Sequence, residues 1–454
     1  MDKRNVTLLL ITIMIIGMFS GCAGESTGLD PKNPLTVTLW HNYGGQMQKT
    51  MDELVDEFNM TLGREKGVIV SVTSISAMKE QEERLKMIAA GDPGAEDMPD
   101  IVTAYPKTAM FLSEQGLLAA LDDYFSQDEL SAFVPQFLEE GRLPDGGLYV
   151  FPIAKSTEVL FVNQTLFDRF AGATGITTDS LATFEGIAQA SIKYYEWTDS
   201  LTPEIHDDGK AFFTADSWFN LAQVGMAQMG ETFVQPGKLI TDLPLYQRIW
   251  DVTLSPALKG GFAITDGYSS ELSKTGDIIC SLGSTAGLLF YSDSITYPDN
   301  RVEDVSYSIL PYPVFADGDN IAIQRGAGLV IANSTSEKEY AASLFLKWFT
   351  APEQNLRFIS STGYLPVTKE AFTRIMENSA QETVDDNVQK LLETAQEMYK
   401  EYDFMTAPNY ESLDEMSRSY ETQIKEVMQE GRQRVQSGET VSGVMEALSP
   451  DRIR

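Results

Sequence analysis

The chain has 454 residues, of which 43% are hydrophobic and 22% charged, which indicates two or three globular domains rather than a disordered or polytopic membrane protein. Lys and Arg number 34 against 66 Asp and Glu, and the resulting net charge of −32 argues against a nucleic-acid partner or binding to an anionic membrane surface by charge alone. Only two histidines are present, so we expect no His-rich metal site and no cofactor.

The N-terminus has the pattern of a cleaved export signal. Lys3 and Arg4 precede an apolar run over residues 6–19, which is shorter than the roughly 20 residues of a spanning helix. The run ends in small residues followed by Cys22, which resembles the lipobox of bacterial lipoproteins, with Phe19 where that pattern prefers Leu. The resemblance implies a signal peptide over residues 1–21 and a lipid anchor on Cys22 at the outer face of the cytoplasmic membrane. An ordinary secreted protein or an uncleaved anchor remain alternatives.

A flexible tether is predicted over residues 22–34, which are rich in Gly, Ser, Thr and Pro. The next part of the chain alternates strands with helices. Strands are expected at 35–40, 68–73 and 101–105, and helices at 47–58, 76–89 and 108–115. This alternation is typical of an α/β fold with a parallel, doubly wound sheet.

After residue 150 helices predominate, and short strands return at 160–163, 278–282, 305–310 and 328–331. We expect the chain to cross between two lobes at 149–155, 305–311 and 362–368. Lobe 1 would then comprise residues 35–150 plus 311–361, and lobe 2 residues 151–310 plus 366–454. Several crossings at one seam make a hinge, with a ligand cleft between the lobes.

A series of different short motifs is spread in order over roughly 330 residues. They include Leu39-Trp40-His41, Met98-Pro99-Asp100-Ile101-Val102, Gly283-Ser284-Thr285, Gly326-Ala327-Gly328 and Gly363-Tyr364-Leu365-Pro366-Val367. In this order they resemble the extracellular solute-binding proteins, family 1, of ABC importers. The resemblance implies a periplasmic-binding-protein-like fold of two lobes, a monomer that captures a small ligand, and delivery to a membrane permease whose ATPase is a separate partner.

Within that family the chain is most similar to glycerol-3-phosphate and oligosaccharide binders. The phosphate binders carry an acidic residue just after the third strand, where this chain has Pro106, and a late arginine that is missing around residues 407–410. We therefore expect a neutral carbohydrate or related polyol, with glycerol 3-phosphate as the alternative.

The candidate ligand-binding residues are aromatic rings, which stack on the C–H faces of sugars, and small polar residues near strand ends or crossings. They are Trp40, Tyr43, Tyr105, Ser156, Ser284, Thr285, Gly326 and Tyr364. Several have a structural alternative, because Trp40 could be core and Ser284 and Thr285 could cap a helix. Helical spacing makes Trp218 a core residue rather than a stacking platform.

Enzyme motifs are missing from the sequence: there is no G-x-S-x-G, no H-E-x-x-H and no P-loop. Carboxylate pairs such as Asp122-Asp123 are common in so acidic a chain, and a glycosidase would need two carboxyl groups facing each other across a cleft. We expect no enzymatic activity. A surface-anchored glycoside hydrolase is the rival hypothesis, and a sensor or adhesion lipoprotein on the same fold is a third.

Overall fold

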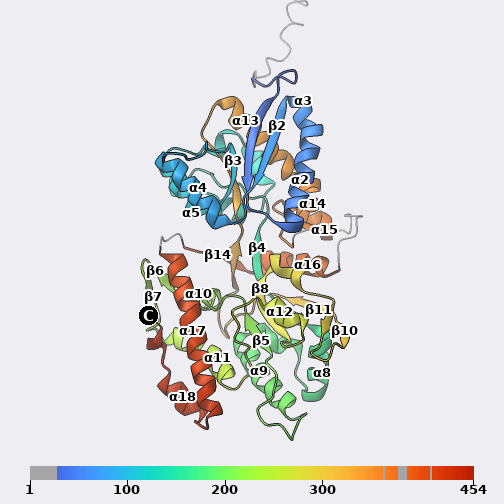
Figure 1. The fold of residues 1–454 in the computed structure, drawn as a ribbon, viewed down its shortest axis with the longest axis vertical. Helices are drawn as coiled ribbons and strands as arrows, with labels where there is room; N and C mark the ends of the chain where they lie inside the picture. The colour runs from blue at the N-terminus through green and yellow to red at the C-terminus, as the bar shows by residue number, and fades with distance from the viewer. Residues whose placement is uncertain (1–27, 361–362, 377–385, 409–411, 454) are drawn as a thin grey trace, which may run out of the picture.

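The computed structural model describes residues 28–360, 363–376, 386–408 and 412–453, and these form two lobes joined at a narrow waist (Figure 1). The predicted signal peptide and Cys22 lie outside the described residues. Within them, no helix is long and apolar enough to cross a membrane.

The upper lobe contains a four-stranded sheet in the order β13-β3-β1-β2. β1 (Leu35–His41) lies parallel to both β2 (Val68–Ser74) and β3 (Ile101–Ala104), and β13 (Gly328–Ile331) pairs antiparallel with β3. The doubly wound pattern is thus present, with one antiparallel edge strand. The helices of this lobe are α2 (Gly45–Met60), α3 (Leu62–Lys66), α4 (Met78–Ala90), α5 (Pro106–Glu114), α6 (Gln127–Ser131), α7 (Pro135–Glu140), α13 (Ser336–Phe349), α14 (Pro352–Ser360) and α15 (Lys369–Met376).

The lower lobe is built on a second sheet in the order β14-β12-β4-β8-β5, with β11 also paired to β4. β4 (Ser156–Asn163) is buried along its whole length because it lies in the middle of this sheet. The other strands are β5 (Phe213–Ala215), β8 (Cys280–Ser284), β11 (Tyr307–Leu310), β12 (Ile321–Arg325) and β14 (Asp403–Thr406), beside the small hairpins β6 (Val234–Gln235) with β7 (Lys238–Leu239) and β9 (Ser294–Thr296) with β10 (Val302–Asp304). The helices are α8 (Gln164–Thr174), α9 (Phe184–Asp199), α10 (Trp218–Gln228), α11 (Pro244–Leu258), α12 (Ser269–Lys274), α16 (Asp386–Glu401), α17 (Leu413–Gln436) and α18 (Val441–Ala447).

The chain first passes between the sheets at residues 152–155, since Phe151 bridges Leu329 of the upper sheet and β4 begins at Ser156. The second passage lies at Gly326 and Ala327, between β12 of the lower sheet and β13 of the upper one. The predicted crossing at 305–311 is therefore wrong, because β11 pairs with β4 inside the lower sheet.

Residues 311–325, which the sequence assigned to lobe 1, belong to the lower lobe. Gln228 of α10 holds this segment by donating hydrogen bonds to the carbonyl oxygens of Pro313 (3.0 Å) and Ile321 (2.9 Å). Pro311 ends a strand as expected, but the chain stays in the lobe.

Residues 366–376 were assigned to lobe 2 and lie instead with the upper lobe. The backbone N–H of Val134 donates to Val367, and that of Lys369 donates to Ala132. α15 then packs between α14 and α16. The lower lobe resumes at α16, which packs on β11.

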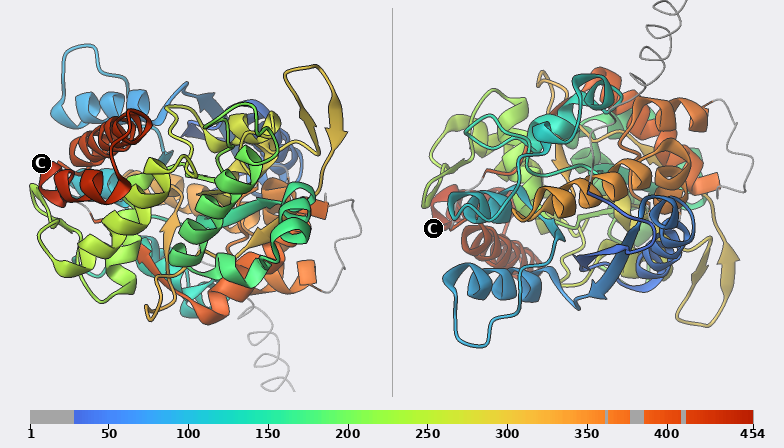
Figure 2. Two further views of the ribbon diagram at one scale, coloured as in Figure 1. Left: turned by 90° about the horizontal axis from the view of Figure 1, so that it is seen from below. Right: turned by 90° about the horizontal axis from the view of Figure 1, so that it is seen from above.

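The C-terminal helices α17 and α18 lie on the same side of the molecule as α4 and α5, as the views along the long axis show (Figure 2). α17 packs on α10 and α11 of the lower lobe. The cleft between the lobes is therefore flanked by α5 above and by α10 and α17 below.

Candidate functional site

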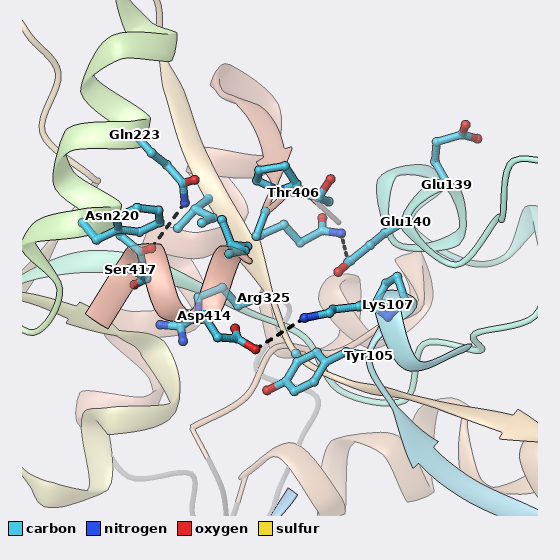
Figure 3. A pocket seen from close by; sticks show the side chains of 18 of the residues that line it. Tyr105, Lys107, Glu139, Glu140, Asn220, Gln223, Arg325, Thr406, Asp414 and Ser417 are labelled. Atoms are coloured by element: carbon cyan, nitrogen blue, oxygen red, sulfur yellow. Dashed lines mark hydrogen bonds and ion pairs between the residues drawn. The ribbon is translucent and has the colours of Figure 1, made fainter. Parts of the chain in front are cut away.

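A cavity of about 510 Å³ opens between the lobes. Its upper wall comes from α4, the start of α5 and the end of α7, and its lower wall from α10, β12, residues 406–408 and the first turn of α17 (Figure 3). Both lobes and the second passage contribute, so any change in the angle between the lobes changes the shape of this cavity.

Tyr105 is the main aromatic surface of the upper wall. It is the N-cap residue of α5, where Pro106 occupies the first helical position, and 41% of it is exposed. Burial raises the pKa of Tyr364 to about 12 and also raises that of Tyr43, and each of these phenols lies within the electrostatic reach of Tyr105. The three tyrosines therefore form one cluster, protonated at neutral pH, beside the cavity.

A chain of polar side chains runs through the lower wall. Glu158 of β4 is 3% exposed and accepts a hydrogen bond from the amide of Asn220 at 2.6 Å. Asn220 in turn accepts from the amide of Gln223 at 3.3 Å, one turn further along α10. Gln223 Oε1 is buried and has no hydrogen-bond partner among the described residues.

Burial raises the pKa of Glu158, while the nearby guanidinium of Arg325 acts in the opposite direction. Arg325 Nη1 lies 3.4 Å from Glu158 Oε1. The ion pair with Arg325 therefore offsets only part of the effect of burial on the pKa of Glu158.

A second glutamine lies where the lobes join. Gln324 Nε2 donates to the carboxylate of Glu140 and to the carbonyl oxygen of Gln136. Lys155, which is 1% exposed, donates to Glu140 at 2.8 Å and to the carbonyl of Gly326 at 3.0 Å. Gln324 Oε1, like that of Gln223, is buried and has no partner within the described chain.

The cationic side chains that line the cavity all have carboxylate partners. Lys107 of α5 lies 3.5 Å from Asp414 of α17 across the cleft (Figure 3). Arg142 lies 3.2 Å from Asp122. Arg325 is paired with Glu158 as above. A ligand that enters therefore meets neutralised cations beside two glutamine oxygens that have no partner among the described residues, and this arrangement suits hydroxyl groups better than phosphate.

Of the eight residues predicted from the sequence, Tyr105 and Gly326 line the cavity. Gly326 has φ = 112°, which only glycine adopts readily, and its carbonyl accepts from Lys155. Tyr43 and Tyr364 belong to the tyrosine cluster behind Tyr105.

The other predicted residues occupy structural positions. Trp40 is 8% exposed and packs in the core of the upper lobe, which was the alternative for this residue. Ser284 caps a short 3₁₀ helix by accepting from the N–H of Ala286, and Thr285 is fully buried and accepts from the N–H of Thr157. Ser156 is 4% exposed in the β4–β12 pair.

Asn220, Gln223, Gln324 and the first turn of α17 were missed. A signal for the first two was present, because amides at i and i+3 interrupt the otherwise apolar run of residues 218–227. Trp218 in the same helix is 2% exposed, so its assignment to the core is confirmed. The contribution of α17 depends on a contact between residues 107 and 414, which no local pattern encodes.

Comparison with known proteins agrees with this architecture. A crystal structure of the cyclic α-maltosyl-1,6-maltose binding protein from Arthrobacter globiformis matches with a TM-score of 0.67 at 17% identity, covering 93% of this chain and 98% of that one. An ABC substrate-binding protein from Listeria monocytogenes in complex with cycloalternan matches with a TM-score of 0.64 at 18% identity, over 93% and 98% of the two chains. UgpB from Mycobacterium tuberculosis in complex with glycerophosphocholine matches with a TM-score of 0.63 at 19% identity, over 91% and 99%.

At these identities the structural matches establish the two-lobe fold alone. No curated protein sequence matches significantly. The sequence profile of the family described as bacterial extracellular solute-binding protein matches residues 53–407, which is most of the chain. This chain is therefore a member of the bacterial extracellular solute-binding proteins.

Proposed function

We propose that this protein is the substrate-binding subunit of an ABC importer and that it captures a carbohydrate, an oligosaccharide or related polyol, between its lobes. The observation that carries the proposal is the cavity itself. It combines the exposed ring of Tyr105 with the carbonyl oxygens of Gln223 and Gln324, which have no partner in the part of the chain that the structure describes. Its cations are already paired. Sugars offer apolar C–H faces and many hydroxyl donors, which match these groups.

The neighbours named for a cyclic maltosyl-maltose and for cycloalternan support a carbohydrate, and the neighbour bound to glycerophosphocholine supports a phosphodiester. Paired cations favour the carbohydrate. Contacts from both lobes would favour the closed state, and a membrane permease would recognise that shape. The protein releases its ligand chemically unchanged. A lipid anchor on Cys22 would keep the protein beside the permease at the outer face of the membrane.

The test is thermal unfolding of residues 23–454 against trisaccharides, cyclic oligosaccharides, polyols, glycerol 3-phosphate and glycerophosphocholine. A ligand present at a hundred times its Kd adds about 2.7 kcal/mol to the free energy of unfolding. In a chain of this size, that increase raises Tm by a few degrees. A shift with a carbohydrate that is recovered intact supports the proposal. Stabilisation by phosphate esters alone contradicts it, and consumption of the carbohydrate would favour a glycoside hydrolase.

A further inference from the structure

The oxygens of Gln223 and Gln324 lack a partner among the described residues for the same reason. A carboxylate has no proton to donate, so any amide that faces it must present its NH₂ group. Glu158 imposes this on Asn220, whose carbonyl oxygen then faces Gln223 and imposes the same orientation there. Each amide in the series is fixed by the one before it, and the last oxygen is left over.

The same restriction applies to Gln324 at the other end of the cavity, but here no second amide lies between the glutamine and the carboxylate. Both of its partners, the Glu140 carboxylate and the Gln136 carbonyl, can only accept. The Nε2 group is therefore committed, and Oε1 is the free end. Lys155 Nζ donates to this carboxylate at 2.8 Å and so occupies the same acceptor group.

Leaving such an oxygen without a partner is costly. A buried acceptor with no donor costs about 1–3 kcal/mol, and here two lie within one cavity. Gln223 lines the cavity, so a rotation of its side chain as the lobes close can bring Oε1 to a ligand group that enters. The free energy recovered at that moment would favour the closed, occupied state.

We infer that Gln223 reads a hydroxyl donor on the ligand, and that Glu158 is a positioning residue that fixes Gln223 as an acceptor through Asn220. This inference rests on the proposed carbohydrate function and deepens it. The ligand must carry a hydroxyl that donates at this point, which a phosphate or carboxylate oxygen does not do at neutral pH.

Calorimetric titration of residues 23–454 with maltotriose, cellotriose, raffinose and glycerophosphocholine tests the inference. Gln223→Met keeps the length of the side chain and removes the carbonyl oxygen, and we expect it to weaken trisaccharide binding about tenfold. Glu158→Gln, which frees the amide series to reverse, should weaken binding in the natural sequence but change it less than about twofold in the Gln223→Met background.

Gln324→Met provides the matched control, because Gln324 is oriented by Glu140 and not by Glu158. The effects of Glu158→Gln and Gln324→Met should therefore multiply, whereas a general structural loss at Glu158 would act equally in every background. Thermal unfolding without ligand checks each variant. If Gln223→Met fails to fold, Gln223→Asn withdraws the carbonyl by one methylene and gives the same measurement.

An unchanged trisaccharide Kd in the folded Gln223 variants would overturn the inference and leave the carbohydrate function standing. Equal weakening by Glu158→Gln in both backgrounds would remove Glu158 from the positioning role. Binding of glycerophosphocholine in place of every trisaccharide, or binding of none of the probes, would contradict the proposed carbohydrate function, on which the inference rests.

Discussion

At the residue scale, the exposed ring of Tyr105 differs from the buried aromatic residues around it. Tyr105 is 41% exposed and lines the cavity, whereas Trp40 is 8% exposed and packs in the core. Exposure of a large ring to solvent costs free energy that stacking on an apolar sugar face would return. Tyr105 is therefore the aromatic residue on which we expect affinity to depend most.

We predict that Tyr105→Ala weakens carbohydrate binding by about 10- to 100-fold, since the loss of a buried stacking ring costs on the order of 1.5–3 kcal/mol. The unfolding free energy should change by less than about 1 kcal/mol. Titration calorimetry measures the binding affinity, and urea unfolding measures the unfolding free energy. Tyr340→Ala in α13 is the matched control, because Tyr340 is a partly exposed tyrosine outside the cavity lining, and equal weakening by both variants would contradict the role of Tyr105.

His41 predicts a specific pH dependence of stability. It is fully buried, and burial lowers its pKa to about 4, while the ring stacks on Tyr43 and accepts the N–H of that residue at 3.1 Å. The unfolded chain binds the proton below about pH 6.5 and the folded chain only below about pH 4. Between these values the unfolded state binds more protons, so stability falls as pH falls, by up to about 3 kcal/mol.

His41→Asn should remove this part of the pH dependence, because an asparagine oxygen can accept the same N–H without titrating. Chemical unfolding of both proteins from pH 7 to pH 4 measures the difference between them, which also cancels the carboxylates that titrate in the same range. Parallel stability curves for the two proteins would show that His41 is not the group responsible.

At the element scale, the strand–helix alternation of residues 35–115 was sufficient to predict the parallel part of the upper sheet. Each strand there is a short apolar run followed by its own amphipathic helix. The lower sheet was harder to predict from the sequence, because no strand was expected where β14 lies. Its four residues gain their stability from parallel pairing with β12, which lies about eighty residues earlier in the chain.

The position of the cavity was foreseen better than its residues. Tyr105 and Gly326 lie beside a strand end and a passage between sheets, and a sequence pattern can mark such places. Gln324 does not stand out, since it lies within an ordinary strand, and its role depends on a carboxylate from α7. Pairwise contacts between distant elements determine which polar groups remain unpaired.

The buried ion pair between Glu140 of α7 and Lys155 connects the upper lobe to the first passage. Lys155→Met should destabilise the protein by about 3–5 kcal/mol, because it leaves the Glu140 carboxylate buried without a counter-charge. Adding Glu140→Gln should restore much of this loss, since an amide can still bond to Gln324. Urea unfolding measures both, and a cost below about 1 kcal/mol for Lys155→Met would show that water or rearrangement replaces the pair.

At the scale of the whole molecule, two lobes joined by a few passages can rotate about the waist while each core stays intact. The ion pair between Lys107 and Asp414 lies across the mouth of the cleft and is partly exposed, so it is worth at most about 1 kcal/mol. A bond of this strength does not lock the lobes. The ligand must therefore supply most of the free energy that favours closure.

Closure predicts a shorter distance between exposed sites on opposite lobes. Spin labels at Lys79→Cys in α4 and Asp266→Cys beside α17 suit this measurement, as these side chains are 83% and 99% exposed. Cys280 is buried, and burial raises the pKa of its thiol, so it should not compete for the label in residues 23–454. A saturating carbohydrate should shorten the distance between the lobes, while a control pair at Lys79 and Lys49, both in the upper lobe, stays unchanged. If the carbohydrate binds and the first distance does not change, recognition occurs without closure, and a permease would have to read the ligand or a rigid surface instead.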